Sequence, residues 1–192
     1  MTLLPARHAV SRGAAEQLVT ARHHKRRTQG QNGNRIMDLQ DLVIPEGVIA
    51  HLKVTSKKQA LQELAAKAAQ VTELDERKIF ETLLERERLG STGVGQGIAI
   101  PHGKLASLDK LHGLFARLDH PIDFDSVDEK PVDLIFLLLA PESAGADHLK
   151  ALARISRLLR NQKMVEKLRA TENNEALYAL LTEPSASATS VA

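Results

Sequence analysis

The chain has 192 residues, of which 43% are hydrophobic and 26% charged, with a formal net charge of +2 and no cysteine. This composition is typical of one globular domain with short extensions, and the lack of cysteine excludes disulfides, zinc–thiolate sites and cysteine nucleophiles. The longest apolar run, residues 134–140, is too short to span a membrane, and no secretory signal opens the chain. We therefore expect a cytoplasmic protein that does not insert into a membrane.

The first 36 residues differ in charge from the rest of the chain. They contain seven lysines and arginines and one acidic residue, a net charge of +6, so the remainder carries −4. Because they offer little that could form a core, we predict a disordered basic extension over residues 1–36. A basic arm can bind nucleic acid, but a solvated tail is the interpretation that we favour, and we expect no nucleic-acid partner. Met37 begins the well-patterned sequence and is a candidate for the true start.

From Met37 onward, β-branched runs alternate with apolar residues at helical spacing. Ser56 followed by Gln59 has the pattern of a capping box at a helix start. We expect strands over residues 48–54, 98–100, 111–118 and 132–140, and a short strand or turn at 122–124. We expect one helix after Ser56 and a second that opens at Leu74 and Asp75. A third helix opens at Ala146 and is interrupted at Asn161, and a last helix is capped by Asn173 or Asn174 and stopped by Pro184.

Strands that alternate with helices predict an α/β fold, in the form of a single layered domain with helices on both faces of the sheet. The nearly continuous apolar run at residues 132–140 is typical of a central strand that is covered on both faces. Short gaps between some strands favour a mixed sheet. We expect this domain to span residues 37–182, followed by a flexible tail over residues 183–192. In the helix that opens at Ala146, the expected inward face consists of Leu149, Leu152, Ile155, Leu158 and Leu159.

The most distinctive stretch is a glycine-rich loop that leads into a short strand and a histidine. Four glycines lie within residues 90–97, and the apolar residues 98–100 then end at Pro101, which His102 follows at once. Neither the P-loop nor the dinucleotide fingerprint fits, because both require a helix after the glycines and here a strand follows. The remaining interpretation is a loop of accessible amides and hydroxyls, suited to an anion, next to a nucleophilic or ligating histidine.

Residues 89–104 resemble the active-site segment of phosphotransferase-system IIA domains of the fructose/mannitol class, and within it the nitrogen-regulatory members most closely. Residues 133–138 and 147–152 are similar to the later strand and following helix of that family, so the resemblance covers residues 37–182. It implies that His102 accepts a phosphoryl group from an HPr-like carrier protein and holds it as phosphohistidine. It further implies that His148 stands across the site and that Arg86, sixteen residues before His102, takes part in transfer.

The chemistry of these residue types agrees with such roles. A neutral imidazole, with an ordinary pKa of about 6.5, is a competent nucleophile near pH 7, and an arginine offers a fixed fork for phosphate oxygens. We expect Ser91, Thr92 and Gly93 to be candidate phosphate contacts, and we expect neither a cofactor nor a metal ion. For His148 the alternative is a surface histidine at a helix start, and for Arg86 it is a solvated charged face.

Three functional interpretations stay open. The first is a phosphocarrier with a regulatory output on nitrogen or carbon metabolism or on potassium transport, through phosphorylation-dependent binding to a target such as a sensor kinase or transporter. The second is a sugar-transport IIA component that passes phosphate to a separate IIB partner. The third is a binding module that transfers no phosphate. The absence of an attached IIB or membrane domain favours the first.

Overall fold

The computed structural model describes residues 38–183. The predicted extension over residues 1–36, the candidate start at Met37, Pro184 and the predicted tail after Glu183 lie outside the described residues. The elements in chain order are η1 (Leu39–Asp41), β1 (Val43–Leu52), α2 (Lys57–Thr72), α3 (Glu76–Arg88), β2 (Gly93–Gly95), β3 (Ile98–Ala99), β4 (His102–Leu105), β5 (His112–Ile122), β6 (Val132–Pro141), α4 (Gly145–Arg160), α5 (Gln162–Ala170) and α6 (Asn174–Thr182).

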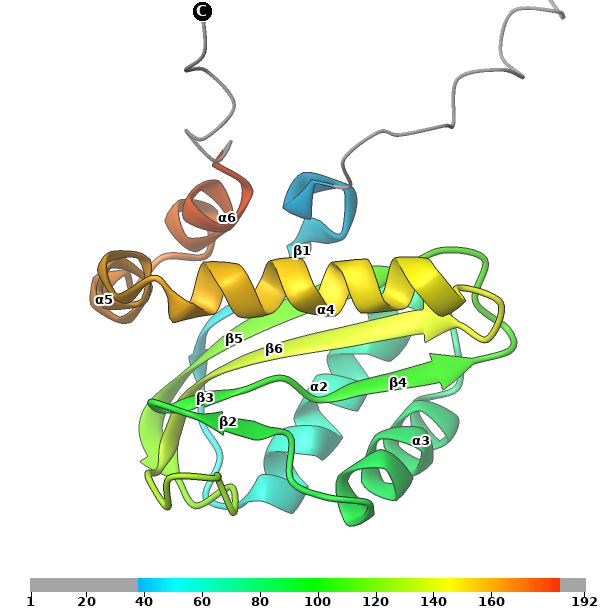
Figure 1. Ribbon diagram of the computed structural model, residues 1–192, viewed down its shortest axis with the longest axis horizontal. Coiled ribbons are helices and arrows are strands. Elements are labelled where there is room, and N and C mark those ends of the chain that lie inside the picture. The colour runs from blue at the N-terminus through cyan, green and yellow to red at the C-terminus, as the bar shows by residue number, and fades with distance from the viewer. Residues whose placement is uncertain (1–37, 184–192) are drawn as a thin grey trace, which may run out of the picture. The chain divides into compact units, whose positions relative to one another are not determined.

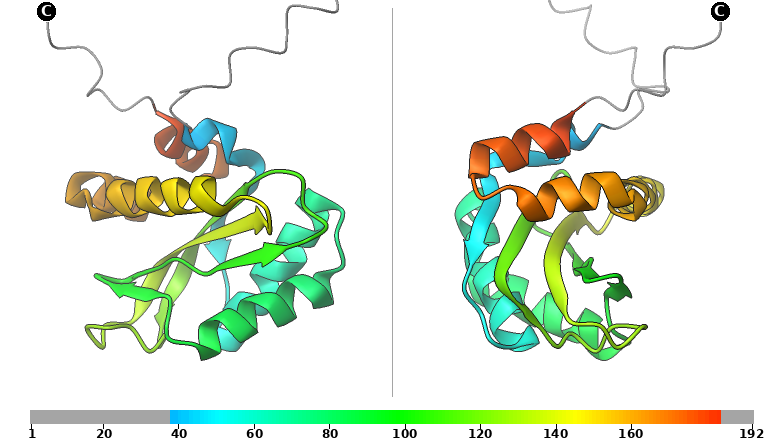
Figure 2. Two further views of the ribbon diagram at one scale, coloured as in Figure 1. Left: turned by 45° about the vertical axis from the view of Figure 1, so that its right-hand side comes forward. Right: turned by 90° about the vertical axis from the view of Figure 1, so that its left-hand side faces the viewer.

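The strands form one mixed sheet in the order β1-β5-β6-β3-β2, with β4 also paired to β6. β5 runs antiparallel to β6, whereas β1 is parallel to β5, and β3 and β4 are both parallel to β6. Helix α4 crosses one face of the sheet, and α2 and α3 cover the other face (Figure 1). The two turned views in Figure 2 agree with this layering. The predicted α/β fold, with a mixed sheet and helices on both faces, is confirmed.

Strand β6 is the centre of the fold because both of its faces are apolar. Ile135, Leu137 and Leu139 belong to the core under α2 and α3. Leu134 and Phe136 belong to the core under α4, α5 and α6, where the ring of Phe136 meets that of its cross-strand partner Phe115 edge-on. An apolar strand of this kind is stable only with a layer packed on each side.

Local capping explains where the helices begin. The side chains of Ser56, Asp75, Asn161 and Asn173 each accept a hydrogen bond from a backbone N–H in the first turn of α2, α3, α5 and α6. The predicted starts are therefore confirmed, and Asn173 is the cap of the last helix. The capping box at α2 is shifted by one residue, because the side chain of Gln59 accepts from the N–H of Thr55 instead of that of Ser56.

Two strands are longer than the sequence predicted. β1 begins at Val43, includes Pro45 and ends at Leu52, two residues before the predicted end. β5 continues through Pro121 to Ile122, which was predicted as part of a separate element at residues 122–124. Each strand has an irregular register at these places. A proline that lacks a backbone donor is tolerated on an edge strand or beside a bulge, which is why pairing continues past these prolines.

Leu149 does not belong to the inward face of α4, contrary to the prediction. Its side chain is 66% exposed, whereas His148, Ala151, Ile155 and Leu159 are buried. These four positions follow the helical period, so His148 takes the inward place in the first turn that the prediction gave to a leucine.

Arg169 links helix α5 to strand β6 and to the β2–β3 turn. From α5 its guanidinium donates to both carboxylate oxygens of Asp133 on β6, at 2.7 and 2.8 Å, and to the carbonyl of Gln96 in the β2–β3 turn at 2.7 Å. Gln96 and Gly97 both have positive φ, of 57° and 79°. A Cβ at Gly97 would lie 2.4 Å from Nη2 of Arg169. Only glycine therefore allows the turn and the arginine to meet without strain.

We expect Gly97→Ala to destabilise the protein by about 1–3 kcal/mol, because alanine is strained at this φ and displaces Arg169. The measurement is the free energy of unfolding from a urea titration. Gly145→Ala is the matched control, since no atom would lie within 4 Å of its Cβ. A loss of stability that is equal in the two variants would contradict the proposed fit at Gly97.

Candidate functional site

The predicted residues His102, Arg86 and His148 line one cleft of about 700 Å³, formed between α3, β4 and the first turn of α4. The cleft also contains Thr82, Glu85, Arg88, Leu89, Gly103 and Lys104. Three segments that are far apart in the sequence therefore meet here. The interpretation of Arg86 as part of a solvated face is wrong, because its side chain turns toward the histidine.

Both ring nitrogens of His102 have a defined partner. Nδ1 lies 2.9 Å from the carbonyl oxygen of Ile100, and Nε of Arg86 donates to Nε2 at 3.0 Å. A carbonyl can only accept and a guanidinium can only donate, so the neutral ring carries its proton on Nδ1 and a lone pair on Nε2. Nη1 of Arg86 is held in turn by the carbonyl of Gly90, at 3.0 Å.

His102 begins strand β4 and does not lie in a loop after a strand, as the sequence suggested. Pro101 interrupts the pairing with β6, and parallel pairing resumes with His102 opposite Leu138. The proline supplies no donor, but its carbonyl still accepts from the N–H of Leu138, at 3.0 Å. His102 therefore lies on a strand that pairs directly with the central strand β6, which fixes its backbone more firmly than a loop would.

Gly103 allows α3 to approach β4. A Cβ at this position would lie 2.8 Å from Cγ2 of Thr82, so any larger residue would push the helix away. Arg86 follows Thr82 by one helical turn and shares its face. The glycine after the histidine therefore brings the arginine within reach of Nε2.

His148 faces His102 across the cleft, with the ring centroids 5.6 Å apart and the planes inclined by 59°. The residue is only 6% exposed, and its Nδ1 has no hydrogen-bond partner among residues 38–183. A buried ring nitrogen without a partner costs free energy, and such an exception in a cleft is a sign of a functional role. The alternative of a surface histidine at a helix start is therefore wrong.

The electrostatics of the cleft keep both histidines neutral. Burial lowers the pKa of His102 below its ordinary 6.5; the Ile100 carbonyl opposes this shift in part, and the Arg86 cation adds to it. Burial also lowers the pKa of His148, as do the neighbouring His102 and Lys104. Near pH 7 the cleft thus combines uncharged imidazoles with fixed cations, an arrangement suited to a dianionic group.

The predicted phosphate contacts Ser91, Thr92 and Gly93 do not line this cleft. The hydroxyl of Ser91 donates to the carbonyl of Phe124 at 2.8 Å and accepts from the N–H of Gly93 at 3.1 Å. Thr92 is buried, and its hydroxyl donates to Glu87 at 2.6 Å. Their role as phosphate contacts stays a prediction. To contact phosphate, Ser91 and Thr92 would have to break the hydrogen bonds that they make here.

Sequence reasoning missed the buried acid Glu87. It is 8% exposed and, besides Thr92, binds the ammonium of Lys57 at 3.0 Å. Burial alone would lower the pKa of Lys57, but hydrogen bonds to Asp125 and Glu87 raise it. The spacing of residues could have predicted that Glu87 is buried, because it follows Ile79 and Leu83 at intervals of four residues along the buried face of α3.

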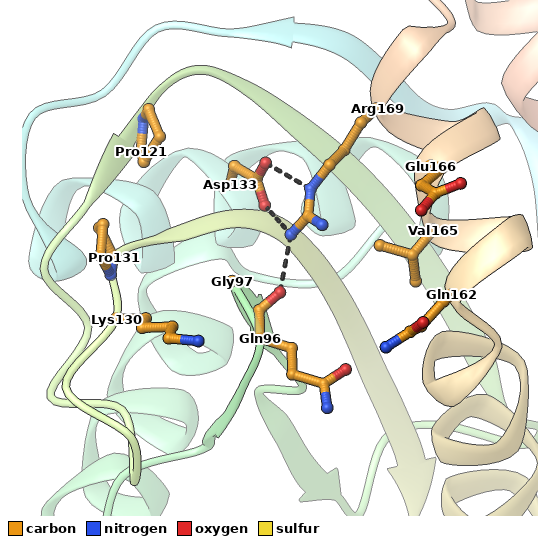
Figure 3. A pocket seen from close by; sticks show the side chains of 10 residues that line it. All are labelled: Gln96, Gly97, Pro121, Lys130, Pro131, Asp133, Gln162, Val165, Glu166 and Arg169. Carbon is orange, nitrogen blue, oxygen red and sulfur yellow. Dashed lines mark hydrogen bonds and ion pairs between the residues drawn. The ribbon is translucent and has the colours of Figure 1, made fainter.

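A second cleft of about 620 Å³ lies at the other end of the sheet, around Arg169. Figure 3 shows its guanidinium reaching from α5 to Asp133 and to the carbonyl of Gln96, with Glu166 and Gln162 on the same helix. No histidine lines this cleft. Within residues 38–183, no three histidine, aspartate or glutamate side chains are placed to hold a metal ion. None of the helices in that range combines the length and the apolar character that a membrane span needs.

Residues 42–183 match the family model described as "Phosphoenolpyruvate-dependent sugar phosphotransferase system, EIIA 2". The chain belongs to this EIIA family. A nitrogen regulatory protein of Bradyrhizobium diazoefficiens is 64% identical over 152 residues, which are 79% of this chain and 99% of that protein. A fructose-specific EIIA component of Haloferax volcanii is 41% identical over 123 residues, 64% of this chain and 79% of that protein. The crystal structure of IIA-Ntr from Neisseria meningitidis has a TM-score of 0.72 and 36% identity, and covers 75% of this chain and 99% of that one.

Membership of the EIIA family confirms the predicted resemblance to phosphotransferase-system IIA domains, including its nitrogen-regulatory members. The chemistry of this family is phosphoryl transfer through phosphohistidine.

We expect Arg86→Met to raise the pKa of His102, because the change removes a nearby cation and a hydrogen bond that only the neutral ring can accept. The measurement is an NMR titration of the imidazole. Arg77→Met, at the other end of α3 in an exposed pair with Glu81, is the control and should leave the titration unchanged. A pKa of His102 that stays the same or falls in Arg86→Met would contradict this electrostatic account.

Proposed function

We propose that Nε2 of His102 accepts a phosphoryl group from an HPr-like carrier protein, and that the phosphorylated and free forms bind regulatory targets differently. The observation that carries this proposal is the pair of hydrogen bonds to the ring. With Nδ1–H bound to the Ile100 carbonyl, Nε2 carries the lone pair, which accepts from Nε of Arg86 in the wall of the cleft, so nucleophile and cation lie side by side. No carboxylate base is needed, since the attacking nitrogen is already unprotonated.

In the transfer step, the lone pair of Nε2 forms a bond to phosphorus while the bond from phosphorus to the donor's nitrogen breaks. The electron pair of that bond returns to the donor. The ring of His102 keeps its proton on Nδ1 and becomes cationic, which strengthens its hydrogen bond to the Ile100 carbonyl. Arg86 moves from Nε2 to the phosphoryl oxygens, and His148 supplies a further contact from the opposite wall. Positioning and charge stabilisation of this kind account for most of phosphoryl-transfer catalysis.

The nitrogen regulatory relatives support a regulatory output. We propose that the targets are proteins of nitrogen or carbon metabolism or of potassium transport, such as a sensor kinase or a transporter. The fructose-specific relative favours a second candidate, a sugar-transport IIA component that passes its phosphate to a separate IIB partner. Transfer from the phosphorylated chain to a purified IIB protein distinguishes the two, because a regulator alone would not support it.

We expect His102→Ala to abolish phosphate uptake from a phosphorylated HPr-like carrier, because the change removes the acceptor. His148→Ala should still be phosphorylated, but about 100-fold more slowly, the cost typical of losing one group that stabilises the developing charge. The measurement is the initial rate of radioactive phosphate incorporation, followed by mapping of the acid-labile product. His120→Ala, an exposed histidine on β5, is the control. Equal incorporation in wild type and His102→Ala would contradict the proposal.

We expect the transfer rate to be highest near pH 8 and to fall to half of that value only below pH 6.5. Protonation of Nε2 destroys the nucleophile, and the pKa of His102 lies below 6.5 because of its burial. The measurement is the single-turnover rate as a function of pH, with the phosphorylated carrier in excess. A midpoint at or above pH 6.5 would contradict the assignment of His102 as the titrating group.

A further inference from the structure

A closed ring, made of hydrogen bonds and of the covalent backbone between Arg86 and Glu87, joins the carboxylate of Glu87 to both nitrogens of His102. The carboxylate accepts from the backbone N–H of Thr92, at 3.1 and 3.2 Å, and from its hydroxyl, at 2.6 Å. The carbonyl of Thr92 accepts from the N–H of Ile100 at 2.9 Å. The carbonyl of Ile100 contacts Nδ1 of His102 at 2.9 Å. Arg86, the neighbour of Glu87 on α3, closes the ring at Nε2.

Glu87 is the part of this ring that is buried and charged. Its carboxylate is balanced by Lys57 at the start of α2, whose ammonium also binds Asp125 and the carbonyl of Phe124. The acid therefore connects α3 to α2 and to the segment before β6. A buried carboxylate with this many partners holds its position firmly, because moving it would leave several polar groups unsatisfied.

The orientation of the Ile100 carbonyl decides which nitrogen of His102 is the nucleophile. If the proton moved to Nε2, this nitrogen would have no lone pair for phosphorus, and its N–H would face the donor Nε of Arg86. The peptide unit of Ile100 is in turn held by the Thr92 carbonyl through its N–H. Thr92 is placed by Glu87. The tautomer of His102 thus depends on an acid that does not contact the imidazole.

We propose that Glu87 is a positioning residue for phosphoryl transfer: through Thr92 and Ile100 it fixes the Nδ1–H tautomer of His102 and so keeps Nε2 unprotonated for the attack. This inference rests on the proposed function of His102. It also assigns Thr92 a role in orientation instead of phosphate contact.

The experiment compares Glu87→Gln with wild type by NMR on protein labelled with ¹⁵N in its histidines. The nitrogen shifts of the ring report the tautomer without any phosphate present. In wild type we expect Nδ1 to be protonated and Nε2 unprotonated. In Glu87→Gln we expect a mixture of tautomers, and a rate of phosphate uptake that falls roughly 10- to 100-fold, as for a small misplacement of a reacting group. The control is Glu81→Gln, which removes an exposed acid of the same helix.

Thr92→Val provides a second test that leaves the buried charge pair intact. It removes the 2.6 Å hydrogen bond from the hydroxyl and preserves the shape of the side chain. We expect the same mixture of tautomers, and Thr92→Ser should restore the wild-type spectrum because it returns the hydroxyl. This comparison decides the matter if Glu87→Gln does not fold.

The outcomes separate this inference from the proposed function. If wild type accepts phosphate on His102 while the Glu87 and Thr92 variants keep its tautomer and rate, the positioning role is overturned and the phosphocarrier stands. If wild type accepts no phosphate but the variants change the tautomer, the ring orients His102 for some other purpose and the phosphocarrier proposal fails. A protonated Nε2 in wild type overturns the inference directly.

Discussion

Both faces of strand β6 are apolar, and the position of the cleft around His102 depends on this fact. Since both faces must be buried, the strand lies inside the sheet with a helical layer on each side. Its free edge then pairs with β3 and β4 in succession, and Pro101 interrupts that pairing just before His102. His102 therefore lies on a strand that is paired to the best-packed element of the fold, while its side chain lines the cleft.

Two polar side chains occupy places that the helical period reserves for apolar residues. On α3, Glu87 continues the series of Ile79 and Leu83, and on α4, His148 precedes Ala151 and Ile155 on the inward face. Burying such groups is unfavourable unless they find partners. Glu87 has Lys57 and Thr92, whereas Nδ1 of His148 has no partner among the described residues. The first therefore stabilises the architecture around the cleft, whereas the second leaves a buried ring nitrogen without a partner in the wall opposite His102.

In the cleft, the candidate nucleophile and the positive charge belong to two different side chains, His102 and Arg86. A phosphate-binding site needs cations, but a cationic histidine cannot attack phosphorus. Burial resolves this conflict, because it keeps the imidazole of His102 neutral while Arg86 stays charged beside it. Gly103 contributes by letting α3 come close enough for one guanidinium to reach Nε2. Neutral nitrogen and fixed cation are thus placed together by packing.

The sequence by itself determined the layered α/β class, the central place of the run at residues 132–140, most helix caps and the choice of His102 as the proposed acceptor, because these follow from local periodicity, capping chemistry and one contiguous motif. Only the tertiary structure decided that His102 begins a strand, that Glu87 and His148 are buried, and that Leu149 is exposed. It also decided that Ser91, Thr92 and Gly93 turn to other partners. Such features depend on which segments meet in space. The spacing of residues along a helix shows which of them share a face, but it does not show whether a polar residue on that face meets water, a lysine or a second histidine.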